Sequence, residues 1–170
     1  MPRLKKRHPA SLLERAIALA VEAHEGHRDA EGRPYLLHAL RVMARVDTDL
    51  ERVVAVLHDA VENGADRVSF ERLRADGFPE EVVVAIDCLT DRDGEAYEDF
   101  IARIAPNPLA RRVKVADLAD HLDLFHHAEI SDRLPSLQRS LRYWHQLREL
   151  DGRAGDDRSG HGPGAVYRPV

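Results

Sequence analysis

A short segment near the middle of the chain combines an imidazole with two carboxylates. In LERVVAVLHDAVEN, residues 50–63, His58 and Asp59 are adjacent and Glu62 follows within one helical turn. Side chains three and four positions apart lie on one face of a helix, so these groups could reach one point. Imidazole and carboxylate are ligands for divalent transition metals. This segment is therefore the first candidate for the chemical centre of the protein.

Apolar residues cover nearly every face of the helix predicted over residues 50–63. A helix of this composition is buried in the middle of a domain rather than laid on its surface. Because burying a lone carboxylate is costly, Asp59 should have a metal ion or another cation beside it. The apolar positions are Leu50, Val53, Val54, Ala55, Val56, Leu57, Ala60 and Val61.

Two further candidates, His38 and Asp117, lie on other predicted helices, each beside apolar residues. With His58 and Asp59 they supply two imidazoles and two carboxylates. This set suits a divalent ion that keeps open positions for water and a phosphate oxygen. Alternatively, His38 is a hydrogen-bonded core histidine and Asp59 is the buried partner of an arginine. The coincidence of all four on apolar helices brings the metal site level with these alternatives, and the residues alone leave both open.

The elements that must position these residues are predicted to be helices, in an all-α bundle of about seven or eight. Capping boxes at Ser11 with Glu14 and at Thr48 with Glu51 mark two helix starts. The strand-like run at residues 82–84 has no visible partner strand and is read as part of a buried helix. Helices are predicted over residues 11–25, 34–46, 50–63, 69–76, 79–89, 95–104, 108–125 and 134–150.

Length and composition limit the class of protein. The 170 residues fit one domain at 11–150, with a flexible N-terminus at 1–10 and a disordered tail at 151–170. Acidic residues outnumber basic ones 30 to 25, which argues against a nucleic-acid partner. A single cysteine, Cys88, suits a reducing cytoplasm, and no apolar run approaches the ~18 residues of a membrane span. The expectation is a cytoplasmic protein that binds no membrane.

Three segments together resemble the signatures of the HD-superfamily hydrolase domain of RelA/SpoT-type proteins, and in particular the small stand-alone (p)ppGpp hydrolases. They are PYLLH, LHDAVEN and VKVADLADHLD, in the family's order and spacing. AHEGHRDAEGRPYLLHALRV is also similar to the family's opening pattern AHxGQ…GxPYxxHPxRV. The resemblance extends from about Ala16 to Leu124. A His-Asp pair alone is a weak signal, whereas this combination is strong.

The resemblance implies that His38, His58, Asp59 and Asp117 bind one metal ion, usually manganese in these hydrolases. It also implies that Glu62 orients or deprotonates the attacking water. Without the resemblance, a carboxylate at the end of a helix is more often a solvated charge.

The resemblance further implies contacts to the substrate. His27 and Arg28 correspond to basic residues that could stack on guanine or hold phosphates, although Arg28 is alternatively a solvated loop charge. Tyr35 and Lys114 also match family positions, and Lys114 could meet phosphate or face water.

The chain departs from the family pattern at two positions. Asn63 replaces the second acid of HDxxED, and His121 stands where ADxxxN has its asparagine. An amide cannot take a proton from water, so the role of general base falls on Glu62 alone. His121 lies one turn after Asp117 and could be a fifth ligand, a phosphate contact or a proton donor.

The function implied by the resemblance is that of a metal-dependent phosphohydrolase with Mn²⁺ as its cofactor. Its expected reaction removes pyrophosphate from the 3′ position of a guanine nucleotide, guanosine 3′,5′-bis(diphosphate). Two alternatives stay open. The same site could act on another nucleotide, such as a dinucleotide phosphate or a nucleoside monophosphate, or the chain could be a nucleotide-binding regulatory module weakened by Asn63. The sequence leaves the oligomeric state open.

Overall fold

The computed structural model describes residues 10–64, 67–124 and 134–156. Within these ranges the regular elements are helices, joined by loops with one isolated β-bridge between Arg28 and Pro34, so the predicted all-α class is confirmed. None of the helices in the described ranges is long and apolar enough to cross a membrane. The helices are α1 (Leu12–Ala23), α2 (Leu36–Ala44), α3 (Asp49–Leu57), α4 (Ala60–Asn63), α5 (Phe70–Ala75), α6 (Glu80–Leu89), α7 (Tyr97–Ile104), α8 (Pro108–Leu124) and α9 (Leu134–Asp156).

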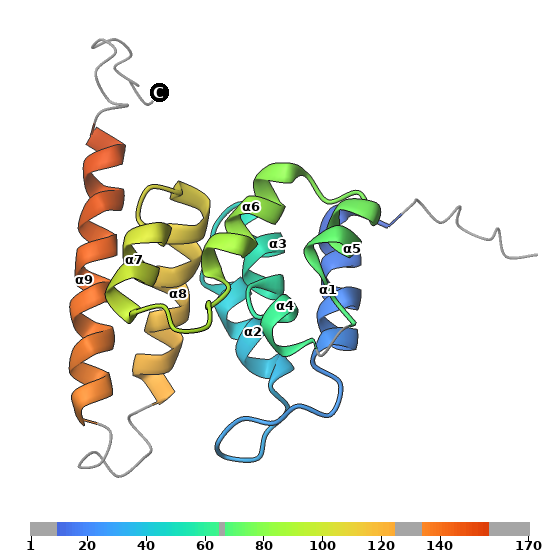
Figure 1. Ribbon diagram of the computed structural model, residues 1–170, viewed down its shortest axis with the longest axis horizontal. Helices are drawn as coiled ribbons and strands as arrows, with labels where there is room; N and C mark the ends of the chain where they lie inside the picture. Colours follow the sequence, from blue (N-terminus) through green and yellow to red (C-terminus); the bar gives the residue numbers. More distant parts are fainter. Residues whose placement is uncertain (1–9, 65–66, 125–133, 157–170) are drawn as a thin grey trace, which may run out of the picture.

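The central helix is α3, which lies between α1 and α8 in Figure 1 and packs against α1, α2, α6 and α8. All side chains at residues 53–57 are buried, as the uniformly apolar sequence predicts. The predicted capping box starts this helix: the Thr48 hydroxyl accepts from the backbone N–H of Glu51, whose carboxylate accepts from the backbone N–H of Thr48. The helix is thus fixed at its start and buried along its length.

The helix predicted over residues 50–63 is divided into α3 and α4 at His58 and Asp59. The Ala55 carbonyl accepts a hydrogen bond from His58 Nδ1 at 2.8 Å, and the Asp59 backbone departs from helical geometry with φ −105° and ψ 3°. On a regular helix, neighbouring side chains project about 100° apart. The break instead lets the side chains of His58 and Asp59 turn toward the same point.

The last helix, α9, continues to Asp156, beyond the predicted end at residue 150. The first residues assigned to the disordered tail are therefore helical, which corrects that boundary. The first residue of the extension contacts α8, where the Asp151 carboxylate accepts from Arg111 Nε at 2.8 Å. The rest of the predicted tail, residues 157–170, and the N-terminal residues 1–9 lie outside the described ranges.

The loop between α6 and α7 is held by a single arginine. Arg103 donates to three carbonyl groups at the end of α6, at distances of 2.8–3.0 Å, and its Nε donates to the Glu95 carboxylate at 3.0 Å. These bonds satisfy carbonyls that a helix end otherwise leaves unpaired. The loop is thereby fixed beside α4 and α8.

Candidate metal centre

Three buried donor atoms from three elements face one another. Nε2 of His38 on α2 lies 3.3 Å from Oδ1 of Asp117 on α8, and Nε2 of His58 at the end of α3 lies 3.9 Å from the same oxygen. The three atoms all lie within 4.8 Å of one another. None of them has a hydrogen-bond partner among the described residues. Unpaired polar atoms in a core are unfavourable, so this arrangement fits a bound cation.

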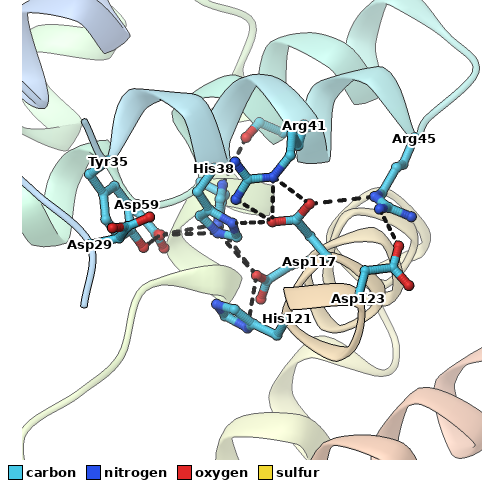
Figure 2. Close-up of polar contacts among 12 residues, drawn as sticks. Asp29, Tyr35, His38, Arg41, Arg45, Asp59, Asp117, His121 and Asp123 are labelled. Carbon is cyan, nitrogen blue, oxygen red and sulfur yellow. Dashed lines mark hydrogen bonds and ion pairs between the residues drawn. The ribbon is translucent and has the colours of Figure 1, made fainter. Parts of the chain in front are cut away.

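Asp59 adds a fourth donor to this group. Its Oδ2 lies 3.1 Å from Nε2 of His58 and 4.0 Å from Nε2 of His38, and it accepts a hydrogen bond from the Tyr35 hydroxyl. Figure 2 shows His38 between Asp59 on one side and Asp117 on the other. Within the described ranges, the partners of Asp59 are these side chains rather than an arginine. Two imidazoles and two carboxylates match the preferences of a divalent transition metal.

The electrostatics of the centre favour positive charge. Burial alone would lower the pKa of the His58 ring, but Asp59 and Asp117 outweigh it and raise the pKa to about 9. Burial also disfavours the ionised form of Asp117, but Lys114 and the neighbouring imidazoles hold the pKa of that carboxyl well below its usual range. Burial also disfavours the ionised form of Asp59, but His58 lowers the pKa of that carboxyl below its usual range. Both carboxylates are therefore ionised at neutral pH, and a bound metal ion would replace a proton on His58.

Lys114 sets the orientation of Asp117. Its Nζ donates to Oδ2 of Asp117 at 2.8 Å and lies 5.1 Å from the centre of the Phe100 ring. Oδ1 of Asp117 is left to face the histidines. Burial would lower the pKa of Lys114, but Asp117 raises it, so the ammonium stays charged. Lys114 thus faces this centre rather than bulk water.

A cavity of about 300 Å³ lies over the centre. Its walls come from the start of α2, from α4, from the loop between α6 and α7, and from α8. Leu89, Tyr97 and Phe100 add apolar surface to it. Of the residues predicted for the site, Tyr35, Asp59, Glu62, Asn63, Lys114, Asp117 and His121 line this cavity.

Glu62 lies at the exposed edge of the cavity. Its Oε2 accepts from the backbone N–H of Asp91 at 3.3 Å. Asp91 belongs to the loop that Arg103 holds, so the position of Glu62 depends on that loop. The carboxylate is accessible to water and lines the same cavity as Asp59 and Asp117, so it could act on a water bound there.

His121 lies beside His38, with the two rings stacked at a centroid distance of 4.9 Å and an interplanar angle of 8°. Nδ1 of His121 is 3.5 Å from Oδ1 of Asp117, and Figure 2 shows the two side chains meeting. Partial burial lowers the pKa of His121, so the ring is neutral at neutral pH. A neutral imidazole can both accept and donate a proton.

His27 and Arg28 are not among the residues that line the cavity. They lie on the loop between α1 and α2, where Arg28 is exposed and donates to the carbonyl of Gly32 at 3.1 Å. His27 is half-buried beside His24, with ring centroids 6.3 Å apart. The structure therefore does not bring these two residues together with the rest of the predicted site.

Asp120 is a buried neighbour of the centre that the sequence patterns did not predict. Its carboxylate contacts Nδ1 of His38 at 2.9 Å and the guanidinium of Arg41. Asp120 lies three residues after Asp117, and this spacing in the sequence predicts that both carboxylates lie near one face of the same helix. No local pattern pairs that face with His38, however, because the two residues lie on helices far apart in the sequence.

A larger cavity of about 760 Å³ lies where α8 and α9 meet the start of α3. Several of its charged side chains have partners: Arg112 contacts Glu51 at 2.6 Å, and Arg148 lies over the Trp144 ring. Among the described residues, the buried unpaired polar atoms belong to the metal centre and to His24 instead. The candidate site is therefore assigned by its chemistry rather than by cavity size.

Comparison with known proteins gives partial similarity to one family, although no model of a known protein family matches the chain. The chain is 34% identical over 120 residues to a GTP pyrophosphokinase of Streptomyces coelicolor and 31% identical over 120 residues to a probable GTP pyrophosphokinase of Mycobacterium leprae. It is 29% identical over 126 residues to a guanosine-3′,5′-bis(diphosphate) 3′-pyrophosphohydrolase of Aquifex aeolicus. These relatives are RelA/SpoT-family enzymes.

The matches cover 65%, 63% and 67% of this chain but only 14%, 15% and 17% of the respective relatives. The chain thus spans a small part of their length. Their names include both pyrophosphokinases and a pyrophosphohydrolase, so the similarity does not choose between the two reactions.

Proposed function

We propose that this protein is a metal-dependent phosphohydrolase of the HD type that removes pyrophosphate from the 3′ position of guanosine 3′,5′-bis(diphosphate). The observation that carries the proposal is the convergence of unpaired donor atoms of His38, His58 and Asp117 beneath a polar cavity. Similarity to a 3′-pyrophosphohydrolase supports the substrate class. The order of the three sequence motifs supports the HD type.

The proposed ligands are His38, His58, Asp59 and Asp117, and the proposed ion is Mn²⁺, on the family resemblance. When bound, a divalent ion polarises a phosphate oxygen and makes a nearby water more acidic. Because its hydroxyl donates to Asp59, Tyr35 would orient this ligand at the cavity wall.

The remaining residues of the cavity perform the proton transfers. Glu62 aligns the water and takes its proton, since Asn63 can orient a water but cannot accept a proton. The water oxygen bonds to the inner 3′ phosphorus while the bond from that phosphorus to the ribose 3′ oxygen breaks. We assign to His121 the relay of this proton from Glu62 to the 3′ oxygen, because its neutral ring accepts a proton at one nitrogen and donates from the other. The products are guanosine diphosphate and pyrophosphate. Lys114 stabilises negative charge on the phosphates from the cavity wall.

The nucleoside would extend out of the cavity toward the loop between α1 and α2. Tyr35 links the two places, because its backbone N–H donates to the carbonyl of His27 at 3.0 Å. We propose that Arg28 and His27 contact the guanine base or its 5′ phosphates there. Arg28 is exposed and its guanidinium can stack on a base or hold a phosphate.

Turnover of a nucleotide panel by the purified protein with Mn²⁺ tests this function. We expect guanosine diphosphate and pyrophosphate from guanosine 3′,5′-bis(diphosphate), loss of turnover in His58→Ala, and a decrease of about 10²–10⁴-fold in Glu62→Gln. Glu71→Gln, an exposed acid on α5, is the matched control. Turnover of only a dinucleotide phosphate or a nucleoside monophosphate would show that the protein is a hydrolase with a different substrate. Binding of nucleotides without turnover would contradict the proposal that the protein is an enzyme.

A further inference from the structure

We propose that Asp120 is a positioning residue that holds His38 in the neutral ring form that can bind a metal ion through Nε2, the nitrogen that faces the centre. In this form Nδ1 carries the hydrogen and Nε2 has a free lone pair. The inference rests on the proposed metal centre and adds a residue that lies behind it, away from the cavity.

The contact between Asp120 and His38 decides which nitrogen is protonated. Asp120 is 1% exposed, and its Oδ2 lies 2.9 Å from Nδ1 of His38. An ionised carboxylate only accepts hydrogen bonds, so Nδ1 must donate. Nε2, on the other side of the ring, then points its lone pair toward Asp117. His58 follows the same pattern, because its Nδ1 donates to the Ala55 carbonyl and its Nε2 faces the centre.

Arg41 keeps the Asp120 carboxylate ionised and fixes its orientation. Nε of Arg41 donates to Oδ1 at 2.8 Å and Nη2 donates to Oδ2 at 2.9 Å, which is a bidentate pair. Nε of Arg45 lies 3.7 Å from Oδ1. Figure 2 shows both arginines reaching across from the helix that carries His38. α2 and its C-cap residue Arg45 therefore supply both the metal-ligand candidate and the cations that hold its partner.

Asp123 offers a matched comparison. It lies one turn after Asp120 on α8 and accepts from Arg45 Nη2 at 2.5 Å, but it is exposed and has no contact with a histidine among the described residues. Both aspartates thus tie α8 to α2 through an arginine. Only Asp120 adds a contact with the ring of His38, which a purely structural ion pair would not need.

Asp120→Asn keeps the size of the side chain but reverses the hydrogen bond to His38. Oδ1 faces the guanidinium groups of both Arg41 and Arg45, whereas Oδ2 faces Arg41 and the ring of His38. Both arginines have only donors, so the amide oxygen takes the place of Oδ1 and the amide NH₂ turns toward Nδ1. Nδ1 would then accept, and the hydrogen would move to Nε2, where it blocks a metal ion. Loss of such a supporting partner typically weakens metal binding about 10–100-fold. We expect this increase in the Kd for Mn²⁺, and a change within about twofold for Asp123→Asn.

Two measurements test the proposal. Nitrogen NMR of ¹⁵N-histidine-labelled, metal-free protein at alkaline pH reports which ring nitrogen of His38 carries the hydrogen, with His38→Gln to assign the signals. We expect Nδ1–H in the wild type and in Asp123→Asn, and Nε2–H in Asp120→Asn. Titration with Mn²⁺ followed by electron paramagnetic resonance gives the Kd of each protein.

The proposal is overturned by any of three results: Nε2–H in the wild type, a wild-type ring that carries both hydrogens, or equal Mn²⁺ affinity in Asp120→Asn and Asp123→Asn. The wild-type NMR measurement needs no variant, so it tests the proposal even if Asp120→Asn does not fold. The proposed function fails separately: a wild type that binds Mn²⁺ without nucleotide turnover contradicts the hydrolase but not the role of Asp120. A wild type that binds no Mn²⁺ contradicts both.

Discussion

At the residue scale, the charges around His58 couple metal binding to pH. Without metal, the pKa of His58 is raised to about 9, so below that pH a metal ion must displace a proton from the ring. Lowering the pH therefore weakens metal binding, and we expect the apparent Mn²⁺ affinity to rise about tenfold per unit between about pH 6 and pH 8. Titrations at several pH values measure this slope. An affinity independent of pH over this range would contradict a protonated His58 in the metal-free protein.

His24 makes a second pH-dependent contribution, this time to stability. Its ring is 4% exposed beside Tyr35, and neither nitrogen has a hydrogen-bond partner among the described residues. Burial lowers the pKa of His24 from 6.5 to about 4. Between these values the unfolded chain binds more protons than the folded one, so stability falls as the pH falls.

The variant His24→Leu should remove this contribution. We expect the loss of unfolding free energy between about pH 7 and pH 4 to become smaller by roughly 3 kcal/mol, measured by urea unfolding. Any cavity or packing effect of the substitution is the same at both pH values and cancels. His145→Leu, at an exposed position on α9, is the control and should keep the wild-type dependence. An unchanged dependence in His24→Leu would show that another group causes it.

At the element scale, the loop between α6 and α7 should depend on Arg103. Arg103→Met removes bonds to three carbonyls and leaves the largely buried Glu95 carboxylate without its cation. We expect a destabilisation of about 2–4 kcal/mol in urea unfolding. Arg74→Met breaks an exposed ion pair with Glu80 and should change stability by less than about 1 kcal/mol. Equal effects of the two substitutions would count against a special role for Arg103.

Local sequence signals predicted the start of a helix well where residues within one turn determine it. The capping boxes at Ser11 and Thr48 form as expected, because each involves residues within one turn. At the break, His58 and Asp59 contact residues of other elements, Asp117 and Tyr35, which a local pattern does not reveal. In the extension of α9, Asp151 likewise contacts Arg111 of α8, which a pattern in the tail does not reveal.

The candidate site could also be predicted only in part, because some of its residues carry a signal in the local sequence and others do not. His58 follows a run of apolar residues, and Asp117 lies in a segment that resembles a family signature, so both were conspicuous in the sequence. Asp120 was not, because one more acid on a helix rich in charge carries no distinct signal until α2 and α8 are brought together. The residues implied on the loop between α1 and α2, His27 and Arg28, came from the resemblance alone and remain a prediction.

At the scale of the whole molecule, the proposed metal centre joins α2, α3 and α8, the helices that form the middle of the bundle. Two ionised carboxylates in this core repel each other, so a bound ion should stabilise the fold. At an Mn²⁺ concentration about 100-fold above the Kd the gain is about 2.7 kcal/mol, which corresponds to an increase in Tm of roughly 5–10 °C.

Thermal unfolding with Mn²⁺ and with a chelator measures this difference, with elemental analysis to confirm that the metal is removed. His58→Gln is the control, since an amide that replaces one ligand should abolish most of the increase in Tm. The same Tm with and without metal in the wild type would argue against an ion buried in the core.

The most direct test of the central claim is an anomalous diffraction map at the manganese edge from crystals grown with Mn²⁺. We predict a single strong peak between Nε2 of His38, Nε2 of His58, the carboxylate of Asp59 and Oδ1 of Asp117, at roughly 2.0–2.3 Å from each ligand atom. A map without a peak at this point, or with Asp117 turned away from an ion bound elsewhere, would contradict the proposed metal centre.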